Sequence, residues 1–352
     1  MTDQTSPTPE EIRAARIEHA AMRERDLSDK LGISEAQLIA AHVGELATPI
    51  EAHPDTVMAA AQKLGEVMAL TRNVSCVHEK VGTYDNYHTG HHAAMVLTEE
   101  IDLRIFPNHW KHAFLIERQS DAAPRRSIQV FDAAGDAVHK IFLRDSSNHD
   151  VWNALKGELA LPEQSDHLAV EPRQAPETPK SDLSKLDILR KEWARMTDTH
   201  QFMRLTSKLK MNRLGAYRIA GEPFVRKLEP TAAAQMLHKV QSAEIEVMLF
   251  VGNRGCIQIH TGPLDTLKPM GPWENVMDPR FNLHLRGDHV AEVWAVEKPT
   301  QRGPALSVEA FDARGMLIFQ VFGLSKEGRD SREAWRKIVE ALPSAQAEPQ
   351  IA

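Results

Sequence analysis

The sequence predicts an α+β protein that arose by tandem duplication, in which each half is an antiparallel β-sheet with flanking helices. The duplication is predicted because the two halves align without gaps at a constant offset of 180 residues. The clearest block is FDAAG at residues 131–135, which falls on FDARG at residues 311–315. The sheets are predicted because each half opens with helical periodicity and continues with apolar or alternating runs between glycines, a pattern typical of strands joined by hairpins.

The repeats are predicted to span residues 10–157 and residues 181–342. Between them, residues 158–180 carry four prolines and little periodic apolar content. Such a composition does not bury an apolar face, so this Pro-rich segment is predicted to be an extended linker.

The first repeat is predicted to contain helices to about Met68, strands to about Leu143 and a helix over residues 147–159. Residues 30–44 (KLGISEAQLIAAHVG) resemble a helix–turn–helix fragment. Their counterpart in the second repeat and the net negative charge of the chain favour a structural pair of helices instead.

The second repeat is predicted to begin with a capping box at residues 184–187, followed by one helix that runs to about Lys210. A shorter helix is predicted to end at Gly221, a residue typical of helix C-caps. The remaining segments are predicted to be strands over 244–252, 255–262, 281–287, 290–297, 305–312 and 316–323, and a closing helix over 331–342.

Composition excludes several classes of protein. The only cysteines are Cys76 and Cys256, without a CxxC motif, which disfavours a zinc ribbon, a covalently attached haem and a disulfide scaffold. The N-terminus lacks the pattern of a signal peptide and no run of about 18 apolar residues occurs, so a soluble cytoplasmic protein without membrane insertion is expected. A net charge of −7 predicts no strong nucleic-acid binding.

The duplication also separates structural positions from candidate site positions. Residues that both copies keep, such as the two cysteines and the two FDA-x-G turns, are expected to serve the shared fold. Residues that differ between the copies are candidates for a site: His200 lies opposite Ala20, Arg104 opposite His284, Lys298 opposite Arg118, and Gln320 opposite Lys140.

His200 is the most informative of these residues, because the predicted helix places it on an apolar stripe with Trp193, Met196 and Met203. A buried imidazole without a partner costs about 1–3 kcal/mol, so a hydrogen-bond acceptor or a metal is expected beside it. Because residue 204 is arginine, neither helical neighbour of His200 is a second histidine, and a zinc pair is disfavoured. A lone imidazole in apolar surroundings suits an axial ligand of haem iron, although a core histidine bonded to a carbonyl remains an alternative.

Four motifs in a fixed order carry a resemblance to a known family. They are NVSCVHEKVGTYDNY at 73–87, IDLRIFPNHWKHAF at 101–114, WARMTDTHQFMRL at 193–205 followed by NRLGAYRIAG at 212–221, and the paired FDA-x-G turns. With them, nearly the whole chain resembles the bacterial haemin-degrading, or cytoplasmic haem-trafficking, proteins of haem-uptake operons.

The resemblance implies haem b (iron protoporphyrin IX) as the cofactor, His200 as its proximal iron ligand and Arg104 on the distal side. It also implies that pocket and propionate contacts come from Arg213, Phe250, Lys298 and Gln320. Many relatives have an arginine where this chain has Ser325, so the resemblance does not assign that propionate contact here, and neighbouring Lys326 is a candidate substitute for the arginine.

The chemistry of these side chains agrees with those roles. His200 is expected to bind iron through Nε2 while a carbonyl or carboxylate holds its Nδ1–H. Asp198 is not expected to be that group, because two residues along a helix point to different faces. Arg104 is expected to stabilise negative charge that develops on bound oxygen. The haem is then expected in the cleft between the repeats.

The predicted function is cytoplasmic haem binding in iron acquisition, with transfer of haem, oxidative degradation of haem, or both. Degradation needs an external reductant, because the sequence shows no flavin or nicotinamide motif. Expected partners are a haem oxygenase or an inner-membrane haem transporter. One alternative is a non-catalytic haem sensor or regulatory binder. Another is a non-haem metalloenzyme built on His88, His91 and His92, which also mark a candidate second haem or metal site.

Overall fold

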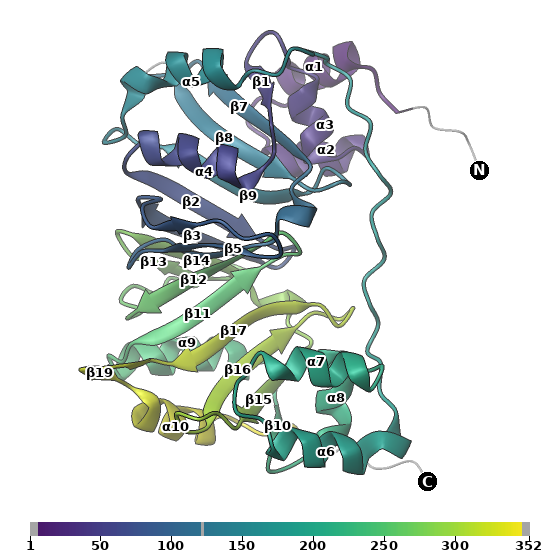
Figure 1. Ribbon diagram of the computed structural model, residues 1–352, viewed down its shortest axis with the longest axis vertical. Coiled ribbons are helices and arrows are strands. Elements are labelled where there is room, and N and C mark those ends of the chain that lie inside the picture. Colours follow the sequence, from purple (N-terminus) through teal and green to yellow (C-terminus); the bar gives the residue numbers. More distant parts are fainter. Residues whose placement is uncertain (1–5, 121–122, 347–352) are drawn as a thin grey trace. The chain divides into compact units, whose positions relative to one another are not determined.

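The protein is described by a computed structural model that covers residues 6–120 and 123–346 (Figure 1). The described chain forms two compact units. The first contains the residues up to 72 together with 78–174 and 252–258, and the second contains 73–77, 175–251 and the residues from 259 onward. The two units therefore differ from two contiguous repeats in two short segments. Residues 73–77 belong to the second unit, and residues 252–258 belong to the first.

The first unit combines an antiparallel sheet with helices. Strands β1, β7, β8, β9 and β2 are antiparallel neighbours in that order, and β3 follows β2. The helices are α1 (Pro9–Glu18), α2 (Glu24–Leu31), α3 (Glu35–Ala40), α4 (Pro54–Lys63) and α5 (Trp152–Leu159), with 3-10 turns η1 (Pro107–His109) and η2 (His149–Val151). The strands are β1 (Ala47–Ile50), β2 (Val67–Arg72), β3 (Cys76–Gly82), β4 (Tyr87–His88), β5 (Ala94–Leu97), β6 (Asp102–Ile105), β7 (His112–Arg118), β8 (Arg125–Phe131) and β9 (Ala137–Leu143).

The second unit repeats this arrangement with the strand order β10-β15-β16-β17-β11-β12. Its helices are α6 (Leu186–Ala194), α7 (Gln201–Lys208), α8 (Arg213–Ala220), α9 (Ala232–Ser242) and α10 (Arg332–Glu340), with η3 (Leu183–Lys185) and η4 (Gly287–His289). Its strands are β10 (Val225–Leu228), β11 (Val247–Gly252), β12 (Cys256–Gly262), β13 (Trp273–Met277), β14 (Phe281–Arg286), β15 (Glu292–Lys298), β16 (Ala305–Phe311), β17 (Leu317–Gly323), β18 (Ser325–Lys326) and β19 (Arg329–Asp330). The same strand order in both units confirms the duplicated α+β fold.

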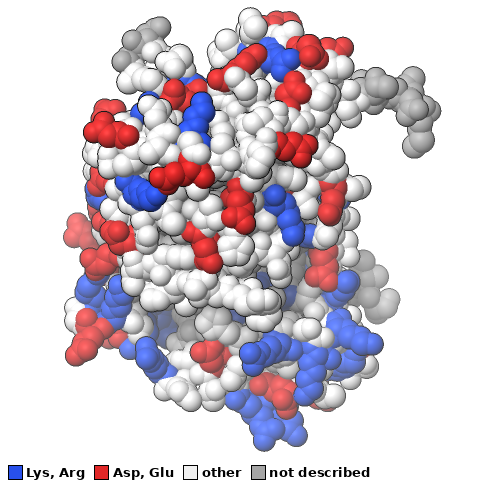
Figure 2. All heavy atoms as spheres, turned by 45° about the horizontal axis from the view of Figure 1, so that its top comes forward, with Lys and Arg blue, Asp and Glu red and all other residues white. Residues whose placement is uncertain are grey.

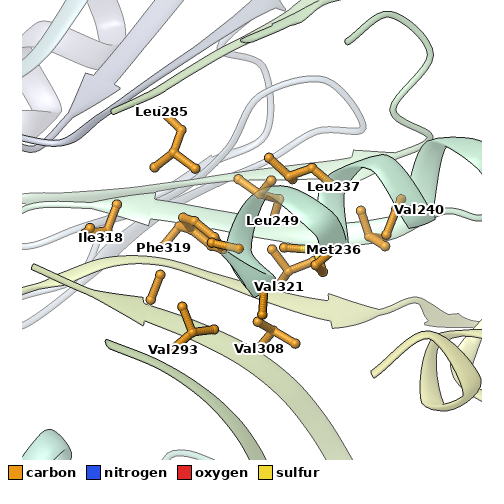
Figure 3. Close-up of a cluster of buried hydrophobic side chains, with 14 of the residues drawn as sticks. Met236, Leu237, Val240, Leu249, Leu285, Val293, Val308, Ile318, Phe319 and Val321 are labelled. Atoms are coloured by element: carbon orange, nitrogen blue, oxygen red, sulfur yellow. The ribbon is translucent and has the colours of Figure 1, made fainter. Parts of the chain in front are cut away.

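One face of the second sheet packs against α9 and α10. Successive strand residues point to opposite faces, so Phe319 and Val321 are buried on this face of β17. In Figure 3, these two side chains and Leu249 lie beside Met236 and Leu237 of α9. The resulting apolar cluster is the largest core of the second unit.

The other face of this sheet packs against α6, α7 and α8, but only over part of its width. The sheet residues in this second core come mainly from β15 and β16, where Trp294, Val296 and Phe311 are buried. On β17 and β11, Gln320 and Phe250 stay partly exposed. The helices therefore leave one part of this face accessible beside them.

The predicted single helix of the second repeat is wrong, because α6 ends at Ala194 and α7 begins only at Gln201. Side chains in the intervening turn replace helical hydrogen bonds: Asp198 Oδ1 accepts from the N–H of His200 at 2.7 Å, and Gln201 Oε1 accepts from the N–H of Thr197 at 2.9 Å. Short polar side chains compete with the helix ladder in this way. The predicted capping box at 184–187 is also wrong, because Asp182 caps a 3-10 turn there instead.

The predicted helical run to Met68 in the first repeat is wrong as well. Strand β1 interrupts it, and its last helix, α4, ends at Lys63. The prediction at Gly221 is confirmed, since α8 ends at Ala220 and Gly221 has a φ of 64°. Glycine adopts a positive φ without steric cost, which explains its use as a helix stop.

The residues shared by the repeats have equivalent structural environments. In the two FDA-x-G turns, Asp132 and Asp312 each accept two backbone hydrogen bonds, from residues two and four positions later. Cys76 and Cys256 begin equivalent strands, are buried and form no disulfide. The two cysteines and the two FDA-x-G turns therefore recur in both repeats because they serve the shared fold.

The Pro-rich linker contains no helix or strand between α5 and η3. Its first part contacts the first unit, where Arg173 bonds both carboxylate oxygens of Asp136 at 2.9 Å. Its last part contacts the second unit, where the N–H of Lys180 donates to Asn212 Oδ1 at 3.0 Å. The linker is thus held at both ends.

Charged side chains of both signs share the surface. Figure 2 shows Asp and Glu interspersed with Lys and Arg on the face in view, with Lys and Arg gathered toward its lower edge. Within residues 6–120 and 123–346, no helix combines the length and the apolar character needed to cross a membrane.

Candidate functional site

His200 lies in the turn that precedes α7, with a side chain that is 94% exposed. The prediction that it belongs to a buried apolar stripe is therefore wrong, and so is the alternative of a core histidine. Trp193 and Met196 are buried as predicted, whereas Met203 is 54% exposed. The cause is the break between α6 and α7, which takes His200 out of helical register with the residues before it.

Asp198 holds the His200 ring, contrary to the prediction. Its Oδ1 lies 2.7 Å from His200 Nδ1, and the same oxygen accepts the backbone N–H of His200. The prediction failed because it assumed helical geometry for a segment that is a turn. Hydrogen bonds from the backbone and then from the ring of His200 hold the pKa of Asp198 below its ordinary value.

The second imidazole nitrogen of His200, Nε2, makes no hydrogen bond to any residue that the structure describes. The ring is therefore anchored at one nitrogen and exposed at the other. This is the arrangement found in histidines that bind a metal through one nitrogen while the other is oriented by a carboxylate.

A cluster of charged side chains lies between the sheet of the second unit and helices α7 and α8. Glu309 on β16 is fully buried, and its two carboxylate oxygens bind different cations. Lys298 Nζ lies 2.9 Å from Oε1, and Arg213 Nη1 lies 2.8 Å from Oε2. Tyr217 donates to Oε2 at 2.9 Å, and Ser307 donates to Oε1 at 2.9 Å. Two cations and one carboxylate leave this cluster with a net positive charge.

Burial and charge act in opposite directions on the pKa values of this cluster. Burial disfavours ionised Glu309, but the charges of Lys298 and Arg213 outweigh that effect and hold its pKa far below the ordinary range. Burial lowers the pKa of Lys298, although Glu309 opposes the shift. Arg213 is also disfavoured by burial, yet Glu309 raises its pKa. Glu309 therefore offsets part of the effect of burial on both cations.

The strand register brings two more predicted residues beside this cluster. Glu309 pairs with Gln320 on β17, and Gln320 pairs with Phe250 on β11. Directly opposed residues of neighbouring strands point to the same face, so these three form one row across the sheet. Phe250 also packs edge-on against Phe322, with ring centroids 5.4 Å apart. The row ends in the partly exposed part of the face.

Met203 connects the His200 turn with the charged cluster. It lies three residues after His200 at the start of α7, and its sulphur is 3.6 Å from Nη2 of Arg213. Arg213 is the first residue of α8, where Asn212 caps the helix by accepting the N–H of Gly215. Helix α7 and the start of α8 therefore bring Met203 and Arg213 together, and the exposed imidazole of His200 and the charged cluster belong to one unit.

Arg104 belongs to the first unit, where it lies on β6. Its Nη1 donates to the carboxylate of Asp102 and, at 3.0 Å, to the carbonyl of Leu103. About a third of its side chain is exposed. It therefore retains N–H groups that can face solvent or a ligand.

Ser325 and Lys326 are both exposed on β18, which pairs with β19 in a short hairpin. Glu246 binds Arg329 of that hairpin, with 2.8 Å between Arg329 Nε and a carboxylate oxygen. Lys326, the candidate substitute for the arginine of the relatives, is therefore accessible.

The alternative metal site at His88, His91 and His92 gains no support. All three side chains are exposed, and the rings of His91 and His92 meet edge-on at 4.7 Å. In the part of the chain that the structure describes, no group of three His, Cys, Asp or Glu side chains is arranged to hold a metal ion.

Sequence reasoning missed Glu309 and Tyr217, although one signal pointed to them. Both differ between the repeats, since Gln129 and Gln37 occupy the equivalent positions of the first copy. Glu309 also alternates with apolar residues along its strand, which made it resemble an exposed position.

An exposed imidazole, one buried and one partly exposed cation, and a partly exposed phenylalanine suit a flat apolar ligand that contains a metal and carries carboxylates. Comparison with known proteins agrees with that class. The profile of the haemin-degrading HemS.ChuX domain matches residues 32–159 and 210–342, once in each repeat. The chain belongs to this haemin-degrading HemS.ChuX family.

Two relatives are similar along nearly the whole chain. Hemin transport protein HmuS of Yersinia pestis is 38% identical over 331 residues, covering 93% of this chain and 95% of that protein. Hemin transport protein HemS of Yersinia enterocolitica is 36% identical over 334 residues, covering 95% and 96%.

Solved structures show the same fold. The heme-binding protein PhuS of Pseudomonas aeruginosa, in its holo form, superposes with a TM-score of 0.91 at 38% identity, covering 96% of this chain and all of that one. ChuS, described as an E. coli heme oxygenase, superposes with a TM-score of 0.84 at 33% identity, covering 94% of this chain and 99% of that one.

Proposed function

We propose that the protein binds haem through His200 and serves iron acquisition by transferring the haem, by degrading it to release iron, or by both. The observation that carries this proposal is the His200 ring, which is exposed, anchored at Nδ1 and unoccupied by hydrogen bonds at Nε2 among the described residues. Membership of the haemin-degrading family supports it, as do the relatives described as hemin transport proteins and a heme oxygenase.

In this proposal, each predicted haem contact of the second unit has its own role. Arg213 is partly exposed and carries a guanidinium suited to a propionate. Lys298 is only 3% exposed, so it contributes positive charge from below the surface. Phe250 and Gln320 offer an aromatic face and an amide beside the ring of the ligand. Together they favour a planar dianionic tetrapyrrole, which we take to be haem b.

Arg104, in this proposal, donates a hydrogen bond toward the bound haem or its oxygen ligand, which is the distal role that the resemblance implies. Its role rests on the resemblance of its IDLR strand to the family and on the N–H groups that remain accessible on the guanidinium. Bound haem supplies an iron centre that reacts with oxygen, and electrons then come from an external reductant. A haem oxygenase or an inner-membrane transporter as partner, and a cytoplasmic location, belong to the same proposal.

Haemin titration of the apo-protein, followed by absorbance, tests the iron ligand. Wild type is expected to bind one haem with a histidine-ligated spectrum, and His200→Ala is expected to lose or reshape that spectrum because Nε2 is the ligand. A triple variant of His88, His91 and His92 to alanine is the matched control, since it removes exposed histidines from another region and is expected to retain the wild-type spectrum. A wild-type spectrum in His200→Ala would refute the proposed ligand.

Addition of ascorbate, or of NADPH with a reductase, in air then separates the two activities. Loss of the Soret band with release of iron is the outcome expected of a degrading protein, and Arg104→Ala is expected to slow that loss. Retention of the band with transfer of haem to a haem oxygenase is the outcome expected of a carrier. Retention without transfer would favour a haem sensor.

A further inference from the structure

One oxygen of Asp198 receives two hydrogen bonds from the same residue. The backbone N–H of His200 and its ring Nδ1 each lie 2.7 Å from Asp198 Oδ1. An exposed histidine normally samples several rotamers, but two bonds to one acceptor restrict both the backbone and the ring. The ring of His200 is therefore oriented although it is 94% exposed and has little packing around it.

The identity of the acceptor also sets the position of the ring proton. An ionised carboxylate only accepts hydrogen bonds, so a neutral His200 must carry its hydrogen on Nδ1 to make this contact. The lone pair is then on Nε2, the nitrogen that has no protein partner among the described residues. Asp198 thus selects the tautomer that leaves the outward nitrogen ready to bind a metal.

Asp198 is itself fixed by the turn. The N–H of Gln201, at the start of α7, donates to the backbone carbonyl of Asp198 at 3.2 Å. The acceptor therefore belongs to the same hydrogen-bonded turn that carries His200. A carboxylate on a flexible loop would not hold a ring in one orientation.

We propose that Asp198 is a positioning residue, which holds His200 in the Nδ1–H tautomer and strengthens electron donation from Nε2 to the iron of bound haem. This inference rests on the proposed function, and it adds a residue that no comparison assigns. Negative charge next to Nδ1–H gives the ring partial imidazolate character, which raises its basicity as a ligand.

The first test uses the apo-protein and needs no haem. Nitrogen-15 NMR of the His200 ring at alkaline pH is expected to show the Nδ1–H tautomer in wild type. Asp198→Ala removes the acceptor, so its spectrum is expected to move toward the Nε2–H tautomer. Asp187→Asn, an exposed acidic residue on α6, is the matched control and is expected to leave the His200 signals unchanged.

The second test uses the haem complex. Asp198→Asn keeps an oxygen that can accept the hydrogen bond but removes the charge. Its ferrous complex is expected to show a lower iron–histidine stretching frequency by resonance Raman and a more positive reduction potential than wild type. Haem affinity is expected to fall by roughly 10-fold, in line with the loss of other groups that orient a metal ligand.

The two tests separate failure of this inference from failure of the proposed function. If wild type binds haem through His200 but Asp198→Ala keeps the wild-type tautomer and Asp198→Asn keeps its stretching frequency, the inference is refuted and the function stands. If wild type shows no histidine-ligated haem, the function and the effect on iron both fail. An unchanged tautomer in Asp198→Ala would by itself refute the positioning role.

Discussion

Glu309→Ala is expected to lower the free energy of unfolding of the second unit by about 3–5 kcal/mol. The carboxylate is fully buried and is the counter-ion of both Lys298 and Arg213. Its removal leaves the buried ammonium of Lys298 with a hydrogen bond to Tyr217 at 3.0 Å, and the partly exposed guanidinium of Arg213 with a contact to the sulphur of Met203. The cost of that unpaired charge exceeds the cost of the small cavity.

Urea unfolding with amide hydrogen exchange in β15 and β16 measures this effect. Glu333→Gln is the control, because Glu333 pairs with Lys337 on the exposed side of α10 and its loss is expected to be undetectable. A double variant, Glu309→Gln with Lys298→Met, is expected to recover part of the stability, since it removes one charge of each sign. Equal midpoints for Glu309→Ala and Glu333→Gln would contradict the proposed charge cluster.

The first unit is expected to lose stability as pH falls, because of one buried histidine. His139 is 1% exposed, with Tyr84 Oη 2.5 Å from its Nε2 and Thr71 Oγ1 2.8 Å from its Nδ1. Burial lowers the pKa of His139 to about 3. The cause is that a charged imidazolium at this position would lose its hydration.

The sign follows from comparing the folded and unfolded states. An unfolded histidine has a pKa of about 6.5, so between that pH and about 3 the unfolded chain binds a proton that the folded chain refuses. Stability is therefore fully present above about pH 6.5 and falls by about 1.4 kcal/mol for each pH unit below it. Between pH 6.5 and pH 5 the expected loss from this residue is roughly 2 kcal/mol.

The second repeat supplies the control for this measurement. Phe319 and Val251 occupy the positions of His139 and Thr71, so Thr71→Val with His139→Phe copies an apolar solution that the chain already contains. Hydrogen exchange of β2 and β9 in urea is expected to show a smaller loss of stability with falling pH in this variant. The slope of stability against pH is the quantity to compare. The absolute stability is not, because the variant also removes the hydrogen bond between Tyr84 and His139. Equal slopes would show that His139 titrates normally.

Most of the fold is predictable from the sequence, because strands and duplication leave independent signals. Alternation between glycines marks β14 to β17, and the offset of the repeats transfers that pattern to β6 to β9. The prediction did not identify β10, β13 or α9, which have weaker patterns. The largest error was the helix through residues 195–200. Its apolar spacing continued across the break, whereas the hydrogen bonds of Thr197 and Asp198 decided the local structure.

The sequence supplied the candidate residues of the site but not their geometry. Differences between the copies marked His200, Lys298 and Gln320 as candidates, and the resemblance added Arg213 and Phe250. Neither source showed that His200 is exposed, because exposure depends on where α6 ends. Neither identified Glu309, because a carboxylate that alternates with apolar residues reads as a solvent-facing position until α7 and α8 are known to cover it.

The two sulfhydryl groups of this protein have an environment that bears on its chemistry in air. Peroxide oxidises a thiolate far faster than a thiol, and exposure governs the rate as well. Cys76 and Cys256 are both buried, and burial raises the pKa of Cys256 to about 12. The folded chain is therefore expected to resist sulfenic acid formation when it is exposed to peroxide.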